Sequence, residues 1–116
     1  MTHTATKHRE LAARRAKLND LTAQCVIPER SCLELDWDDE EIGFLDLTLV
    51  DLDRGPIVTI DTWGTKERYD LTTYGRGPNV QSSRTRHDLT WEEAAAGFMD
   101  IVTKTIEAEI PLMWRP

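Results

Sequence analysis

The sequence has few of the features typical of secreted or membrane-bound proteins. Among 116 residues there are two cysteines, Cys25 and Cys32, which are too few for a disulfide framework. No apolar run approaches the roughly 18 residues that a membrane-spanning helix needs, and the first ten residues contain no apolar signal-peptide core. We therefore expect a cytoplasmic protein with reduced thiols and no membrane attachment.

Motifs for cofactor binding and catalysis are also missing from the sequence. It contains no CxxC or HxxxH pair for zinc and no glycine-rich phosphate loop between a predicted strand and a helix. The acidic segment that begins at Asp36 fails the EF-hand pattern, because Glu41 and Leu47 occupy the positions that require glycine and glutamate. Ser83, His87 and Asp88 stand close together, but on a predicted loop that would not hold catalytic groups rigidly. We expect no metal, no cofactor and no enzymatic activity.

Charge is abundant and unevenly distributed along the chain. There are 21 acidic against 14 basic residues, a net charge of −7. Residues 1–30 carry six bases and three acids (+3), residues 31–70 carry three bases and twelve acids (−9), residues 71–90 carry +2 and residues 91–116 carry −3. The acidic middle block disfavours generic nucleic-acid binding and is the strongest single feature of the sequence.

Hydrophobic periodicity predicts an α+β fold in a single small domain, residues 1–116. About four antiparallel strands in a meander are flanked by an N-terminal and a C-terminal helix. The predicted segments are a basic helix over 4–24, an antiparallel sheet over 32–72, a polar loop over 73–87 and a core helix over 90–110. Asp88 or Thr90 is expected to cap the second helix, with Glu93 completing a capping box, and Pro111 is expected to end it.

Alternation with period two assigns side chains to the two faces of the sheet. The inward positions are Leu33, Leu35, Trp37, Leu45, Leu47, Leu49, Val58, Ile60, Tyr69 and Leu71. The first helix has only a thin apolar stripe of Leu11, Leu18, Leu21 and Cys25, so it is expected to dock through one narrow seam with its basic residues exposed.

The outward positions predict an acidic sheet face. It combines Glu34, Asp36, Asp46, Asp61 and Asp70, with a rim formed by Asp38, Asp39, Glu40 and Glu41. Like charges on neighbouring strands destabilise a sheet. This cost would be offset by the basic helix, by nearby bases such as Arg54, or by a basic partner. We expect these carboxylates to be solvated and their pKa values to be unperturbed.

The leading hypothesis is a small, acidic, non-enzymatic protein that binds and inhibits a basic partner protein. Its acidic face would occupy the lysines and arginines with which a nucleic-acid-binding partner contacts phosphates. The physical type is that of phage anti-defence proteins and toxin-neutralising immunity proteins. Trp114 either packs on the core or serves as an exposed anchor for the partner.

Two alternatives remain open at this point. In the first, the chain is an accessory protein that binds nucleic acid through Lys7, Arg14, Arg15, Lys17, Arg76, Arg84 and Arg86. In the second, it is a structural subunit of a larger assembly, or a homodimer, that uses Trp114 and the first helix.

Overall fold

The described part of the chain consists of two long helices and five strands. The computed structural model describes residues 2–38, 44–64, 66–75 and 83–113, with side chains for 11–36, 44–64, 66–75 and 83–108. In chain order the elements are α1 (Thr2–Gln24), β1 (Ser31–Asp38), β2 (Phe44–Asp51), β3 (Gly55–Trp63), β4 (Tyr69–Thr73), β5 (Arg84–Leu89) and α2 (Trp91–Met113). The predicted α+β class is confirmed.

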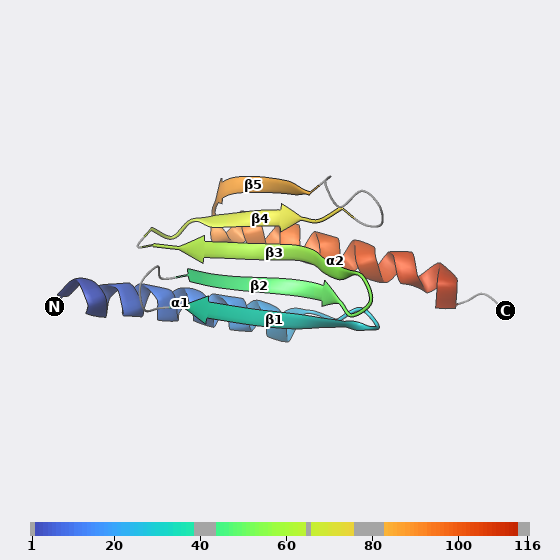
Figure 1. Ribbon diagram of the computed structural model, residues 1–116, viewed down its shortest axis with the longest axis horizontal. Helices are drawn as coiled ribbons and strands as arrows, with labels where there is room; N and C mark the ends of the chain where they lie inside the picture. Colours follow the sequence, from blue (N-terminus) through green and yellow to red (C-terminus); the bar gives the residue numbers. More distant parts are fainter. Residues whose placement is uncertain (1, 39–43, 65, 76–82, 114–116) are drawn as a thin grey trace.

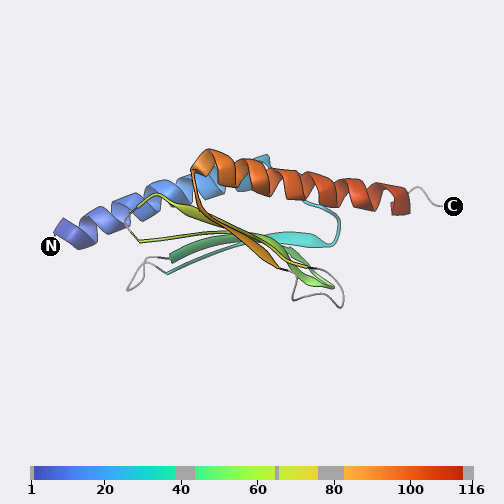
Figure 2. The same cartoon turned by 90° about the horizontal axis from the view of Figure 1, so that it is seen from above.

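All five strands join one antiparallel sheet in the order β1-β2-β3-β4-β5. Every strand pairs with its neighbours in the sequence, so the meander is confirmed, with one strand more than the predicted four. Both helices lie on the same side of the sheet, α1 against the β1–β2 half and α2 against the β3–β5 half (Figures 1 and 2). No described element covers the other side, which we call the open face.

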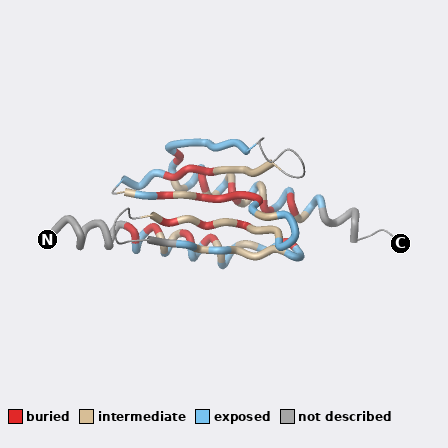
Figure 3. Tube along the Cα trace, viewed as in Figure 1, coloured by how far each residue is buried: buried red, intermediate tan, exposed pale blue. Residues whose placement is uncertain are grey.

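The core lies between the sheet and the helices, as the alternation predicts. Leu45, Leu47 and Leu49 of β2 are fully buried and belong to one apolar cluster with Leu18 of α1 and Phe98 of α2. Buried positions alternate with partly exposed ones along β2, whereas β3 and β4 contain runs of consecutive buried residues (Figure 3). Burying each of these large apolar side chains contributes roughly 1.5–3 kcal/mol.

The start of α2 follows the predicted capping box. The Thr90 backbone N–H donates to Glu93 Oε1 at 3.1 Å, and the Glu93 N–H donates to Thr90 Oγ1 at 3.2 Å, which satisfies two N–H groups at the helix end. The predicted end is wrong, because α2 continues past Pro111 to Met113. The fixed φ of proline is itself helical, so a proline near the helix end removes one hydrogen bond without forcing the helix to stop.

The predicted polar loop over 73–87 is partly wrong, because its second half belongs to β5. The strand Arg84–Leu89 pairs with β4, and its residues from Arg84 to Asp88 are exposed. An edge strand of this kind is held by backbone hydrogen bonds and by polar pairs such as Thr72 with Thr85, whose hydroxyls are 2.9 Å apart. It has no apolar alternation, which is the signal that strand prediction relies on.

Both helices run past the sheet at opposite ends of the molecule (Figure 1). The molecule is therefore elongated, at 63 × 29 × 23 Å with a radius of gyration of 15.6 Å, against about 13 Å for a compact domain of this length. The projecting helix ends stay on the helical side of the sheet (Figure 2). They therefore leave the open face accessible.

Candidate functional site

Four aspartates stand side by side across the open face. In the strand register Asp36 of β1 lies opposite Asp46 of β2, Asp46 lies opposite Asp61 of β3, and Asp61 lies opposite Asp70 of β4. Because neighbouring strands are about 4.8 Å apart, the four carboxylates form a line across the strands. We call Asp36, Asp46, Asp61 and Asp70 the aspartate row.

A second line of polar side chains runs next to the first. Glu34 lies opposite Thr48, which lies opposite Thr59, and Thr72 and Thr85 continue the line on β4 and β5. The four hydroxyl residues, Thr48, Thr59, Thr72 and Thr85, are called the threonine row. Their hydroxyls bond in pairs, at 3.0 Å between the first two and 2.9 Å between the last two. Thr59 Oγ1 also donates to Tyr74 Oη at 3.4 Å, so the Tyr74 phenol lies beside the threonine row.

The carboxylates at the centre of the row are partly buried, so the expectation of fully solvated groups is wrong. Desolvation by burial raises the pKa of Asp61 to about 6, and repulsion from Asp46 and Asp70 adds to the rise. Burial also raises the pKa of Asp46, followed by repulsion from Asp36, and Asp46 Oδ1 is out of contact with solvent without a hydrogen-bond partner. Close packing of side chains on neighbouring strands thus keeps water from groups that face outward.

The row ends at β5 in a carboxylate that has partners. Asp70 is 9% exposed; its Oδ2 lies 2.9 Å from His87 Nδ1 and its Oδ1 accepts the Asp88 N–H at 3.1 Å. The strand register shifts at this point, and Asp88 has φ 57°, the left-handed conformation typical of a bulge. The bulge turns His87 and the Asp88 N–H toward Asp70, which leaves Asp36, Asp46 and Asp61 as the part of the row without a side-chain partner among the described residues.

The basic side chains of α1 that the structure describes do not cover the acidic face. The Arg14 guanidinium, predicted to be exposed, is 2% exposed on the helical side of the sheet, and it donates to Thr62 Oγ1 at 2.7 Å and to the carbonyls of Gly64 and Lys66. Lys17 forms an ion pair with Glu67. Of the ion pairs that join described residues, none involves Asp36, Asp46 or Asp61. Compensation by the first helix, one of the predicted possibilities, is therefore not provided to these three carboxylates by any α1 side chain that the structure describes.

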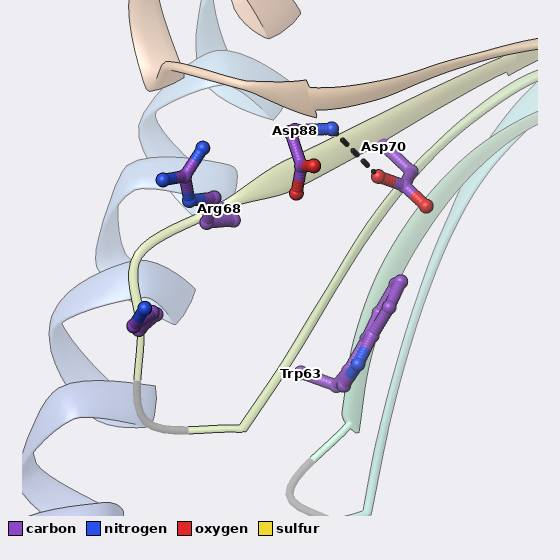
Figure 4. A pocket seen from close by; sticks show the side chains of 5 residues that line it. Trp63, Arg68, Asp70 and Asp88 are labelled. Carbon is purple, nitrogen blue, oxygen red and sulfur yellow. Dashed lines mark hydrogen bonds between the residues drawn. The ribbon is translucent and has the colours of Figure 1, made fainter.

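A cavity of about 340 Å³ opens beside the β4 end of the row, lined by Trp63, Lys66, Arg68, Asp70 and Asp88. Arg68 and Asp88 lie on one side of it and the Trp63 indole on the other (Figure 4). Two basic and two acidic side chains line it, so the formal charges of the lining balance. The cavity also presents an accessible aromatic surface, because Trp63 is 50% exposed.

The other predicted partner-binding residues lie beyond what the structure describes. Asp39, Glu40, Glu41 and Trp114 fall outside the described residues, and so does the side chain of Asp38. Glu34 and Asp36 are exposed on β1, next to the rest of the acidic face. The structure thus brings together the five predicted carboxylates from Glu34 to Asp70 whose side chains it describes.

The residues of the nucleic-acid alternative do not converge on one described surface. Arg14 is buried, Arg15 is partly buried and Lys17 is paired, while Arg76 and the side chain of Lys7 are outside the described part. Arg84 and Arg86 are exposed on β5, at the edge of the sheet farthest from α1 (Figure 1). Among the described residues, Arg14 is therefore not available to a nucleic acid, and the exposed arginines of β5 lie apart from the first helix.

Sequence reasoning missed the threonine row and the contact between Asp70 and His87. A signal for the former is present, since Thr48, Thr59 and Thr72 each stand two residues from an aspartate of the row. Two residues along a strand is one step on the same face, so the repeated spacing indicates two parallel lines. The His87 contact has no such signal, because it depends on the bulge in β5.

Comparison of the chain with protein-family models, curated proteins and solved structures found no match. Neither α1 nor α2, over its described residues, is long and apolar enough to cross a bilayer. Within the described ranges, no three His, Cys, Asp or Glu side chains are grouped as metal ligands. The functional argument therefore rests on the geometry of the open face.

Proposed function

We propose that this is a non-enzymatic binding protein whose open face docks on a basic surface of a partner protein and inhibits it. The observation that carries the proposal is the line formed by Asp36, Asp46 and Asp61 on three adjacent strands. These carboxylates repel one another, they lack ion pairs with described residues, and no described element covers them.

A basic partner would relieve the strain that the fold imposes on this face. Each lysine or arginine that approaches the row adds an attractive interaction that offsets the repulsion between the carboxylates, and it favours the ionised forms of Asp46 and Asp61. Like charges opposite each other on neighbouring strands destabilise a sheet. Relief of this repulsion in the complex would therefore contribute to the free energy of binding. Complementary charge of this kind also accelerates association.

The proposed inhibition is competition for cationic side chains. A nucleic-acid-binding protein uses lysine and arginine to neutralise phosphates. Carboxylates held about 4.8 Å apart would occupy those same groups. Binding should therefore weaken as salt concentration rises, because the pairs at such an interface are screened.

The test compares two variants that lose the same amount of charge on opposite sides of the molecule. The row variant carries Asp36→Asn, Asp46→Asn and Asp61→Asn. The helix-face variant carries Asp20→Asn, Asp100→Asn and Glu107→Gln, all at exposed positions of α1 and α2. Each protein serves as bait in extracts of the cells that express the chain, and the captured proteins are identified by mass spectrometry.

We expect wild type and the helix-face variant to capture the same nucleic-acid-binding protein and the row variant to lose it. The purified partner should release a labelled oligonucleotide when wild type is added, and the row variant should fail to displace it. Retention of the partner by a folded row variant would refute the proposal. So would a partner that keeps its oligonucleotide when wild type is bound.

A further inference from the structure

We infer that the part of the partner that lies on the open face is an α-helix with lysine or arginine along one side, lying across the strands and along the aspartate row. This inference rests on the proposed function and adds the shape of the partner to it. It follows from the spacing of the three unpaired carboxylates and from what lies on either side of them.

The first argument is the step length of the row. From Asp36 through Asp46 to Asp61 the line crosses two strand spacings, about 10 Å in all. Two turns of an α-helix advance about 11 Å, so side chains at every third or fourth position meet three successive carboxylates with a mismatch of about 1 Å. Flexible lysine and arginine side chains can take up that difference.

An extended partner strand fits this spacing poorly. Its side chains on one face are two residues apart, about 6.7 Å, so three of them span about 13 Å. The mismatch over the same three carboxylates is then about 4 Å. A partner strand that runs along one strand of the sheet would contact only one aspartate of the row, because each strand of the sheet contributes only one.

The second argument is the shape of the surface on both sides of the row. On one side, the Thr59 hydroxyl bonds to Thr48 and donates to Tyr74 Oη at 3.4 Å, and Thr59 is 4% exposed beneath these neighbours, so a helix would meet hydroxyl-bearing side chains there. On the other side, Phe44 lies opposite Trp63 in the register, and the Trp63 indole is half exposed. A helix with apolar residues beside its basic stripe would place them on this aromatic pair.

The third argument is where the row ends. Asp70 is already bonded to His87 Nδ1 and to the Asp88 N–H, so it offers less to a partner than the other three carboxylates. The row available to a partner therefore matches about two turns of helix, with three cationic positions. That length predicts a short recognition segment rather than a long coiled coil.

The experiment uses three labelled synthetic peptides with equal numbers of lysines. The first is an alanine-rich helix with lysines at every third or fourth position along one side, and the second is the same composition with lysines spread round the helix. The third is a strand-forming peptide with lysine at alternate positions. Fluorescence anisotropy at low salt and neutral pH measures the Kd of each for wild type, the row variant and the helix-face variant.

We expect the striped helix to bind wild type about tenfold more tightly than the scattered helix, a difference of about 1.4 kcal/mol. The helix-face variant should keep that preference and the row variant should lose it. In NMR spectra of wild type, the striped helix should shift the Trp63 indole N–H and the backbone amides of Asp46 and Asp61. Circular dichroism and urea unfolding confirm that each variant is folded.

Three results would overturn the inference. Equal binding of striped and scattered helices, lost in the row variant, would refute the helical partner but leave the acidic docking face in place. Tighter binding of the strand-forming peptide would have the same meaning and would favour an extended partner. Binding of none of the three peptides would refute the helical partner, and the pull-down with the row variant would then decide the proposed function by itself.

Discussion

Replacing Asp61 with asparagine should make the protein more stable at neutral pH, although Asp61 faces outward. Burial and the neighbouring carboxylates raise its pKa from 3.8 to about 6. At 1.36 kcal/mol for each pH unit, the rise corresponds to about 3 kcal/mol. Since the side chain is only partly buried, solvent screening reduces this figure, and we expect a gain of about 1–2 kcal/mol at pH 7.5. Asparagine keeps the shape of the side chain and removes the charge.

The pH dependence distinguishes this cause from a general effect of the substitution. A carboxylate whose pKa is higher in the folded protein than in the unfolded chain binds its proton more tightly in the folded state. Its contribution to the free energy of unfolding therefore falls as pH rises from about 4 to about 6, and it stays low above that range. The advantage of Asp61→Asn should be full at pH 7.5 and nearly absent at pH 4.

Urea unfolding of wild type and Asp61→Asn at pH 7.5 and at pH 4 measures the difference. Asp20→Asn on the exposed surface of α1 is the matched control, with an expected change within about 0.5 kcal/mol at both pH values. An equal gain for Asp61→Asn at both pH values would contradict the electrostatic explanation. A loss of stability at pH 7.5 would show that the carboxylate makes a favourable contact in the fold.

Three further substitutions test the packing and capping that position the open face. Arg14→Met should cost about 3 kcal/mol or more in urea unfolding, because it leaves buried acceptors without a donor; a cost below 1 kcal/mol would contradict this role. Thr90→Ala should cost about 1 kcal/mol and lower the Tm, since it removes the hydroxyl that accepts the Glu93 N–H while the Thr90 N–H can still donate to Glu93; an unchanged Tm would show that the hydroxyl contributes nothing. Gly97→Ala should destabilise the protein by about 1 kcal/mol, because the new Cβ would lie 2.5 Å from Leu71 Cδ2. This clash is expected to outweigh the better helix propensity of alanine. A stabilised variant would mean that Leu71 moves aside freely.

Local sequence patterns predicted most of the fold. Alternation with period two identified β1 to β4 and the buried leucines of β2, and the spacing from Thr90 to Glu93 identified the start of α2. These signals depend on residues a few positions apart, whose relation is set by the repeat of a strand or a helix turn. β5 was missed because an exposed edge strand has no apolar repeat.

The acidic face could be predicted only in part from local sequence patterns. The sequence by itself determined that the aspartates of β1 to β4 point to the side opposite the core, because side chains alternate along a strand. Only the tertiary structure decided that Asp36, Asp46 and Asp61 are direct neighbours, because register depends on the turns between strands and on the core that both faces share. It also decided that both helices pack on the other side, where Arg14 is buried, so that no described side chain of α1 pairs with these carboxylates. The packing of neighbouring strands also excludes water from Asp61 and raises its pKa. This effect depends on contacts between strands, so the sequence of one strand does not predict it.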